Sequence, residues 1–224
     1  MKEKEKPSFK DNLSNFIQKY KIAILVVIGV SLISALSFAL YLEIDKGHQV
    51  EVAKNYQKNL KLFEEWKVSE PNDNKDVLES SFIQSIETDI NSITQGFVSQ
   101  KLHLLMADYY KEKNDSVKRA EQYQIALQSS PSSSFNAGIL FLLADTQEQN
   151  KDLISAKKSL QEILEMQNSE AILLHPLVWL SIARIEEQQL NTEEALKAYT
   201  MILDNYPDND LSKFARTRVI ALNL

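Results

Sequence analysis

Pairs of alanines recur along the second half of this chain at a fixed spacing. Ala183 and Ala195 are twelve residues apart, and Ala144 and Ala156 repeat this spacing 39 residues earlier. A weaker copy begins at Ala107, 37 residues before Ala144. A sequence period of this size is typical of helix-turn-helix units that bury their apolar faces only by stacking on one another. The recurrence therefore predicts a stack of helix pairs.

Small side chains have a physical role in such a stack, because two antiparallel helices approach most closely where no long side chain separates them. Short polar stretches at 113–116, 150–152 and 190–194 are predicted to be the turns inside the three units. Asn191 and Glu194 have the spacing of a capping box at a helix start. Pro176 suits the first turn of a helix.

The composition agrees with an all-α fold. Only four glycines and five prolines occur in 224 residues, so long helices with few tight turns are expected. The absence of cysteine excludes disulfides, thiolate metal sites and a cysteine nucleophile. The formal net charge of −6 argues against nucleic acid as a partner, because phosphate binding requires a basic surface.

The first 42 residues differ from the rest. Residues 1–21 form a basic tail, and residues 22–42 contain no charge and are long enough to span the hydrocarbon core of a membrane as a helix. The lysine excess predicts a cytoplasmic N-terminus and an extracytoplasmic body. A cleaved signal peptide is the alternative, because Ser37 and Ala39 supply a small-x-small pair after the apolar run.

Apolar stripes at helical spacing predict further helices before the repeats. One stripe starts at Val52 and ends at Phe63, and a second runs from Phe82 to Phe97. Residues 43–96 are therefore predicted to be a helical stalk or a degenerate first helical pair. Residues 209–224 are predicted to be a capping helix over the last unit.

The third unit resembles the tetratricopeptide repeat in its aromatic, small and proline positions. The second unit keeps the alanine spacing but lacks the aromatic and proline positions, and in the first unit the second alanine, Ala120, is displaced by one. The resemblance covers residues 97–208 and implies three repeats in an α-solenoid. The residues expected to pack these repeats are Ala107, Ala126, Ala144, Ala156, Trp179, Ala183, Ala195, Tyr199 and Pro207.

A basic tail, one span and a tetratricopeptide-like domain together resemble the bacterial YfgM-like family of single-pass inner-membrane proteins, which are ancillary to the Sec translocon. This resemblance implies a location in the bacterial inner membrane. It also implies polypeptide partners, such as the translocon, envelope-assembly factors or periplasmic chaperones.

Tetratricopeptide geometry places the residue after each first alanine in a concave groove lined by the first helices. This selects Asp108, Asp145 and Arg184, with Phe141 and Leu180 nearby. A groove of mixed charge and apolar character suits an extended or helical peptide.

No catalytic, cofactor or metal motif is present in the sequence, so we expect no enzymatic activity and no cofactor. The adjacent acidic pair Glu186 and Glu187 is interpreted as a solvated face. The function expected is a membrane-anchored scaffold or chaperone-like accessory of protein export or envelope assembly. The alternative is a structural subunit that self-associates through its repeats or its span.

Overall fold

The computed structural model describes residues 53–71 and 73–223, which lie within one unit of the chain, Ala53–Leu224. Every regular element in these residues is a helix, so the all-α prediction is confirmed for this part of the chain. The helices are one over residues 53–68, α2 (Asp73–Ser92), α3 (Gly96–Glu112), α4 (Ser116–Ser129), α5 (Asn136–Gln149), α6 (Leu153–Glu165), α7 (Ser169–Gln188), α8 (Thr192–Asn205) and α9 (Leu211–Leu222).

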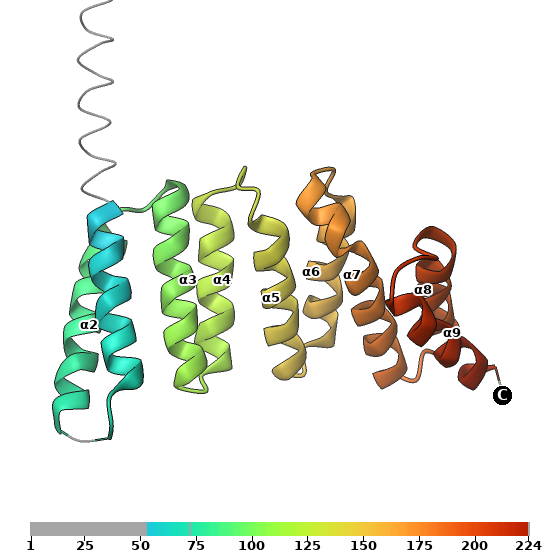
Figure 1. The fold of residues 1–224 in the computed structure, drawn as a ribbon, viewed down its shortest axis with the longest axis horizontal. Coiled ribbons are helices and arrows are strands. Elements are labelled where there is room, and N and C mark those ends of the chain that lie inside the picture. The colour runs from blue at the N-terminus through green and yellow to red at the C-terminus, as the bar shows by residue number, and fades with distance from the viewer. Residues whose placement is uncertain (1–52, 72, 224) are drawn as a thin grey trace, which may run out of the picture. The chain divides into compact units, whose positions relative to one another are not determined.

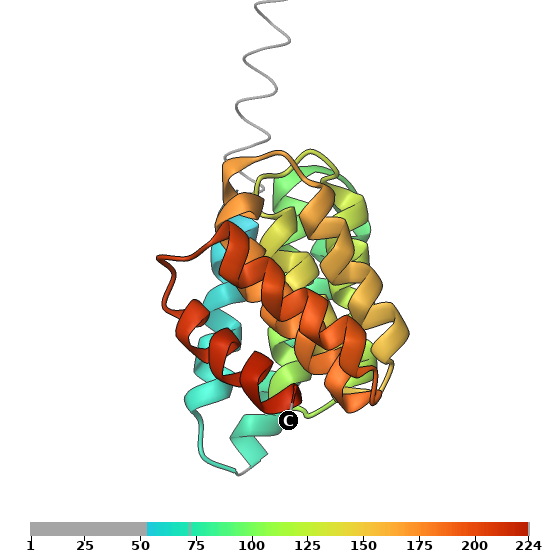
Figure 2. The same ribbon diagram turned by 90° about the vertical axis from the view of Figure 1, so that its right-hand side faces the viewer.

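Within this unit α2 to α9 stand side by side in chain order, and helix 53–68 lies beside α2 on the side of α3 (Figure 1). Figure 2 looks along the row, with α8 and α9 in front. From α2 onwards each helix packs on the next. The contact between α2 and α3 is the least extensive of these. In addition, α5 contacts α7 and α7 contacts α9, whereas α6 makes no such contact with α4 or α8. This repeat-like packing fits an α-solenoid in general. The helices α5, α7 and α9 lie closer to one another than α4, α6 and α8 do.

One turn geometry joins the two helices of each of the three units. Asn114, Lys151 and Leu190 have a left-handed backbone, with φ of 56°, 64° and 61°. The next residue in each turn donates its N–H to the carbonyl five residues before it, at 2.9 Å in all three cases. This Schellman arrangement satisfies carbonyls at the end of the first helix. The turns are 37 and 39 residues apart, so the period of the sequence is also a structural period.

Three positions of the unit are buried in every copy. They lie seven residues before the turn residue (Ala107, Ala144 and Ala183), nine after it (Tyr123, Leu160 and Tyr199) and twelve after it (Ala126, Ile163 and Ile202), and none is more than 5% exposed. These side chains fill the contact between paired helices and between neighbouring units.

The copies differ five residues after the turn. Ala156 and Ala195 are fully buried there, whereas the first unit places Arg119 at that position, 8% exposed. The Arg119 guanidinium donates to Gln149 Oε1 at 2.7 Å and so ties α4 to the end of α5. Ala120 is therefore not the equivalent of Ala156, which corrects the alignment of the first unit.

The core consists of three apolar clusters that follow one another along the row. One joins helix 53–68, α2 and α3 around Phe63, Phe82 and Tyr109. A smaller one joins α3, α4 and α5, and the largest runs from α5 to α9. Residues 53–92 thus form a helical pair that packs on α3.

Two sequence expectations about helix ends are wrong. The apolar stripe from Phe82 to Phe97 is not one helix, because α2 ends at Ser92 and α3 begins at Gly96. Pro176 lies inside α7, because Asn168 caps this helix by accepting the Ala171 N–H at 3.3 Å and so starts it seven residues earlier than expected.

Asn191 occupies the N-cap position of α8, as expected, but it forms no capping box with Glu194. Its side chain accepts no hydrogen bond from α8, and its amide instead donates to Glu186 Oε2 at 2.9 Å. Pro207 is exposed beyond the end of α8, and Trp179 is half-buried and packs against the largest apolar cluster.

The predicted membrane span, residues 22–42, lies outside the described residues. Among the helices that are described, none is both long and apolar enough to cross a membrane.

Candidate binding groove

Exposed and half-buried side chains follow one side of α3, α5 and α7. They are Phe97, Lys101, Leu104 and Asp108 on α3, Leu142, Asp145 and Glu148 on α5, and Leu177, Leu180 and Arg184 on α7. Glu148 joins two of these helices, because its carboxylate accepts hydrogen bonds from Arg184 and Gln188 at 2.8 Å each. We call this surface the first-helix face.

Four of the five groove residues selected from the sequence are among the residues of this face, and the fifth, Phe141, lies on α5. Asp108, Asp145 and Arg184 are exposed on three successive first helices, and Phe141 and Leu180 are half-buried. They do not form one site: Asp145 accepts a hydrogen bond from Gln149 on its own helix at 2.8 Å, and Arg184 pairs with Glu148.

A groove of about 560 Å³ lies on this face between helix 53–68, α3 and the start of α5. Asp108 is the only sequence-selected residue that lines it. Its apolar walls are Tyr56, Leu60, Phe97, Leu104 and Phe135, and its polar rim includes Glu64, Lys67, Lys101 and Asp108. The backbones of α3 and α5 do not approach one another as closely as those of α5 and α7. The first-helix face is therefore open between α3 and α5.

Phe97 and Phe135 form an exposed aromatic pair in this groove. Their rings stack with centroids 5.4 Å apart and an interplanar angle of 26°, although the side chains are 44% and 57% exposed. Gly96 directs Phe97 to the surface: its φ of +88° starts α3 in a conformation that residues with a Cβ rarely adopt. Large exposed aromatics of this kind are typical of binding surfaces.

A buried amide network fixes the position of Phe135. Gln100 Nε2 donates to Asn136 Oδ1 at 2.8 Å and to the carbonyl of Ala126 at 3.2 Å. Asn136 Nδ2 in turn donates to the carbonyls of Ser130 and Pro131 at 3.0 and 2.9 Å. The loop between α4 and α5 is thereby held against α3, and the aromatic pair follows from this arrangement.

Lys101 lies in the middle of the aromatic wall. Its ammonium nitrogen is 4.6 Å from the centroid of Phe97 and 5.2 Å from that of Tyr56. The ring faces attract the cation. The groove therefore presents positive charge beside apolar surface.

The opposite end of the groove is acidic. Burial raises the pKa of Asp108, although Lys111 and Lys67 act in the opposite direction. Lys67 itself forms an ion pair with Glu112 at 2.7 Å. Asp108 thus adds negative charge two helical turns from Lys101.

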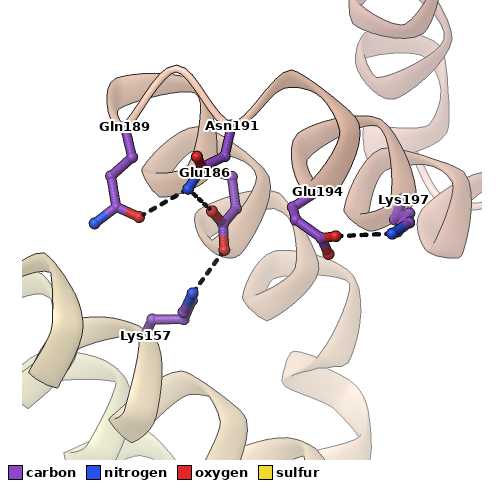
Figure 3. Close-up of polar contacts among 6 residues, drawn as sticks. All are labelled: Lys157, Glu186, Gln189, Asn191, Glu194 and Lys197. Atoms are coloured by element: carbon purple, nitrogen blue, oxygen red, sulfur yellow. Dashed lines mark hydrogen bonds and ion pairs between the residues drawn. The ribbon is translucent and has the colours of Figure 1, made fainter.

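A second recess lies between α6, α7 and α8. Glu186 lines it, is 4% exposed and accepts hydrogen bonds from Lys157 on α6 and from Asn191, both at 2.9 Å (Figure 3). Glu187 pairs with Arg218 on α9 and accepts a hydrogen bond from Tyr199 at 2.7 Å. The interpretation of Glu186 and Glu187 as a solvated face is therefore wrong: both carboxylates join neighbouring helices.

Metal-ligating side chains do not gather in the described ranges, where no group of three or more His, Cys, Asp or Glu residues is placed to hold an ion. His103 is 6% exposed and its Nδ1 lies 2.8 Å from Gln122 Oε1. Comparisons of the chain with protein-family models, curated proteins and solved structures find no match.

Proposed function

We propose that this protein is a membrane-tethered scaffold or chaperone-like accessory of protein export or envelope assembly. In this proposal residues 22–42 are the tether, residues 97–208 are three tetratricopeptide-like repeats, and the first-helix face binds polypeptide partners.

The observation that carries this proposal is the open groove with the Phe97 and Phe135 pair. Its apolar walls and charged rim have the chemistry needed to bind an extended chain, with apolar pockets for side chains and polar groups at the rim. The three equivalent turns and the shared buried positions support the repeat assignment.

The test is a comparison of partners that co-purify with the full-length protein from its own membranes. Replacing both aromatics (Phe97→Ser, Phe135→Ser) removes the groove wall, so we expect specific partners to be lost by about tenfold or more, as for hot-spot residues. The control is Phe214→Ser on α9, which is similarly exposed at 51% but lies outside the groove.

Equal recovery of partners by the double variant and by Phe214→Ser would contradict the groove as the binding site. Self-association as a structural subunit stays the alternative, and it predicts a discrete homo-oligomer in detergent with no other protein bound.

A further inference from the structure

We propose that the groove between helix 53–68, α3 and α5 selects extended polypeptide segments in which an acidic side chain is next to an aromatic or leucine side chain. This inference rests on the proposed function and adds the chemistry of the segment that is bound. Two features of the groove carry it: a cation and an apolar wall.

The cation is Lys101. Within residues 53–71 and 73–223 no carboxylate lies within ion-pair distance of its ammonium group, and its contacts are the rings of Phe97 and Tyr56. Other lysines nearby, such as Lys67, are already paired with a carboxylate. An acidic side chain of a bound segment would complete this site with a charge-assisted hydrogen bond.

The apolar wall next to Lys101 is formed by the stacked rings of Phe97 and Phe135, with Leu104 on the same helix. About half of each aromatic side chain is exposed. An aromatic or leucine side chain lying against them would remove this surface from water, and aromatic neighbours add a favourable ring contact. The acidic and apolar groups of the ligand therefore have to be close together.

Asp108 sets the length and the direction of the segment. Lys101 and Asp108 are seven residues apart on α3, which is roughly 10 Å along a helix. An extended chain crosses this distance in roughly three residues. The acidic residue of the ligand is therefore expected at the Lys101 end, because a carboxylate beside Asp108 would be repelled.

The experiment is fluorescence anisotropy with the full-length protein in detergent. The probe is a fluorescein-labelled, end-blocked peptide, Gly-Ser-Asp-Phe-Leu-Ser-Gly, and it is compared with peptides that have Asn or Lys in place of Asp. We expect the Asp peptide to bind about tenfold more tightly than the Asn peptide at low salt, with a smaller difference at high salt.

Variants at position 101 identify the cation. Lys101→Met should remove the preference for Asp over Asn, and Lys101→Glu should reverse it in favour of the Lys peptide. Lys158→Met is the matched control, because Lys158 is exposed on α6 outside the groove, and this variant should keep the wild-type preference. Circular dichroism of each variant separates lost selectivity from lost folding.

Three results would overturn the inference. Equal binding of the Asp, Asn and Lys peptides removes the charge selection but leaves polypeptide binding intact. Failure of all peptides to bind, while co-purification still depends on Phe97 and Phe135, leaves the proposed function but rejects this ligand chemistry. A dimer that the Phe97→Ser, Phe135→Ser variant dissociates would show that a second copy covers the groove.

Discussion

Leu190 is the clearest case of a residue in a conformation that its own side chain disfavours. It has a left-handed backbone, with φ of 61°, and its side chain is 88% exposed and so gains little from packing. Left-handed geometry costs a residue with a Cβ roughly 1–2 kcal/mol. Glycine avoids this strain, but it loses more conformational freedom on folding than other residues. That loss costs roughly 0.5–1 kcal/mol and offsets part of the gain.

Leu190→Gly is therefore expected to raise the free energy of unfolding by about 0.5–1 kcal/mol, measured by urea denaturation. Lys158→Gly is the control in an exposed, right-handed helical position, and it should lower the same quantity by about 1 kcal/mol. Equal destabilisation by both substitutions would mean that the left-handed backbone does not strain Leu190.

Two buried or half-buried carboxylates make the stability dependent on pH. The Arg218 guanidinium holds the pKa of Glu187 below its usual range. Burial acts to raise the pKa of Glu186, but hydrogen bonds from Lys157 and Asn191 outweigh it and lower the value. A lowered pKa in the folded state contributes stability above the unfolded pKa, about 4.3 for glutamate, and this stability is lost as the pH falls through the folded value.

We expect the urea midpoint to fall as the pH drops below about 4.3, and Glu187→Gln to reduce this fall. Glu162→Gln on α6 is the control, because Glu162 is exposed and has no ion pair in the described structure. A pH profile of Glu187→Gln identical to that of the wild type would rule out this carboxylate as a source of the acid sensitivity.

Sequence periodicity located the buried alanines and the turn residues, because both recur with the unit. It did not locate Glu148, Phe135 or Gln100. These residues act through partners on other helices, and nothing in the local sequence indicates which partner a side chain will meet. One local signal existed for Phe97: Gly96 directly before it marks a helix break, since glycine favours the left-handed start seen there.

At the scale of the helix, the close approach within each pair depends on the first alanines. Ala183 is fully buried in α7, which packs on both α5 and α8. Ala183→Leu forces extra methyl groups into a packed contact, so the free energy of unfolding should fall by about 1–3 kcal/mol. Thermal or urea unfolding of the full chain measures the change.

Ala221→Leu is the matched control, because Ala221 is exposed on α9. It should change the stability by less than about 0.5 kcal/mol, as is usual for surface substitutions. Equal effects at the two positions would mean that Ala183 does not limit the approach of the helices.

Helix ends were predicted less well than helix existence. The sequence places Pro176 at a helix start, but Asn168 caps α7 two turns earlier, and the chain tolerates a proline without an N–H inside the helix. Asn191 does stand at the N-cap of α8, but its side chain donates to Glu186 and does not cap the helix. In both cases a contact specific to this structure outweighs the local pattern.

At the scale of the whole described unit, the groove depends on an irregularity in the stack. The backbones of the neighbouring first helices α5 and α7 approach one another closely, whereas those of α3 and α5 do not, and the groove lies beside this wider interval. A repeat pattern predicts what the units share, so it predicted the first-helix face. It does not predict where one interval is wider than the others, and the recess with Phe97 and Phe135 was therefore missed.

The most direct measurement of the central claim is site-specific photocrosslinking of the full-length protein in its own membranes. The probe is placed at Leu142 or Leu177 on the first-helix face, and at Ile154 or Met201 on α6 and α8. Leu177 and Met201 are almost equally exposed, at 37% and 38%, so they differ in the face and not in accessibility. We predict polypeptide adducts from Leu142 and Leu177 and few from Ile154 and Met201; adducts formed equally on both faces, or only from α6 and α8, would contradict the first-helix face as the binding surface.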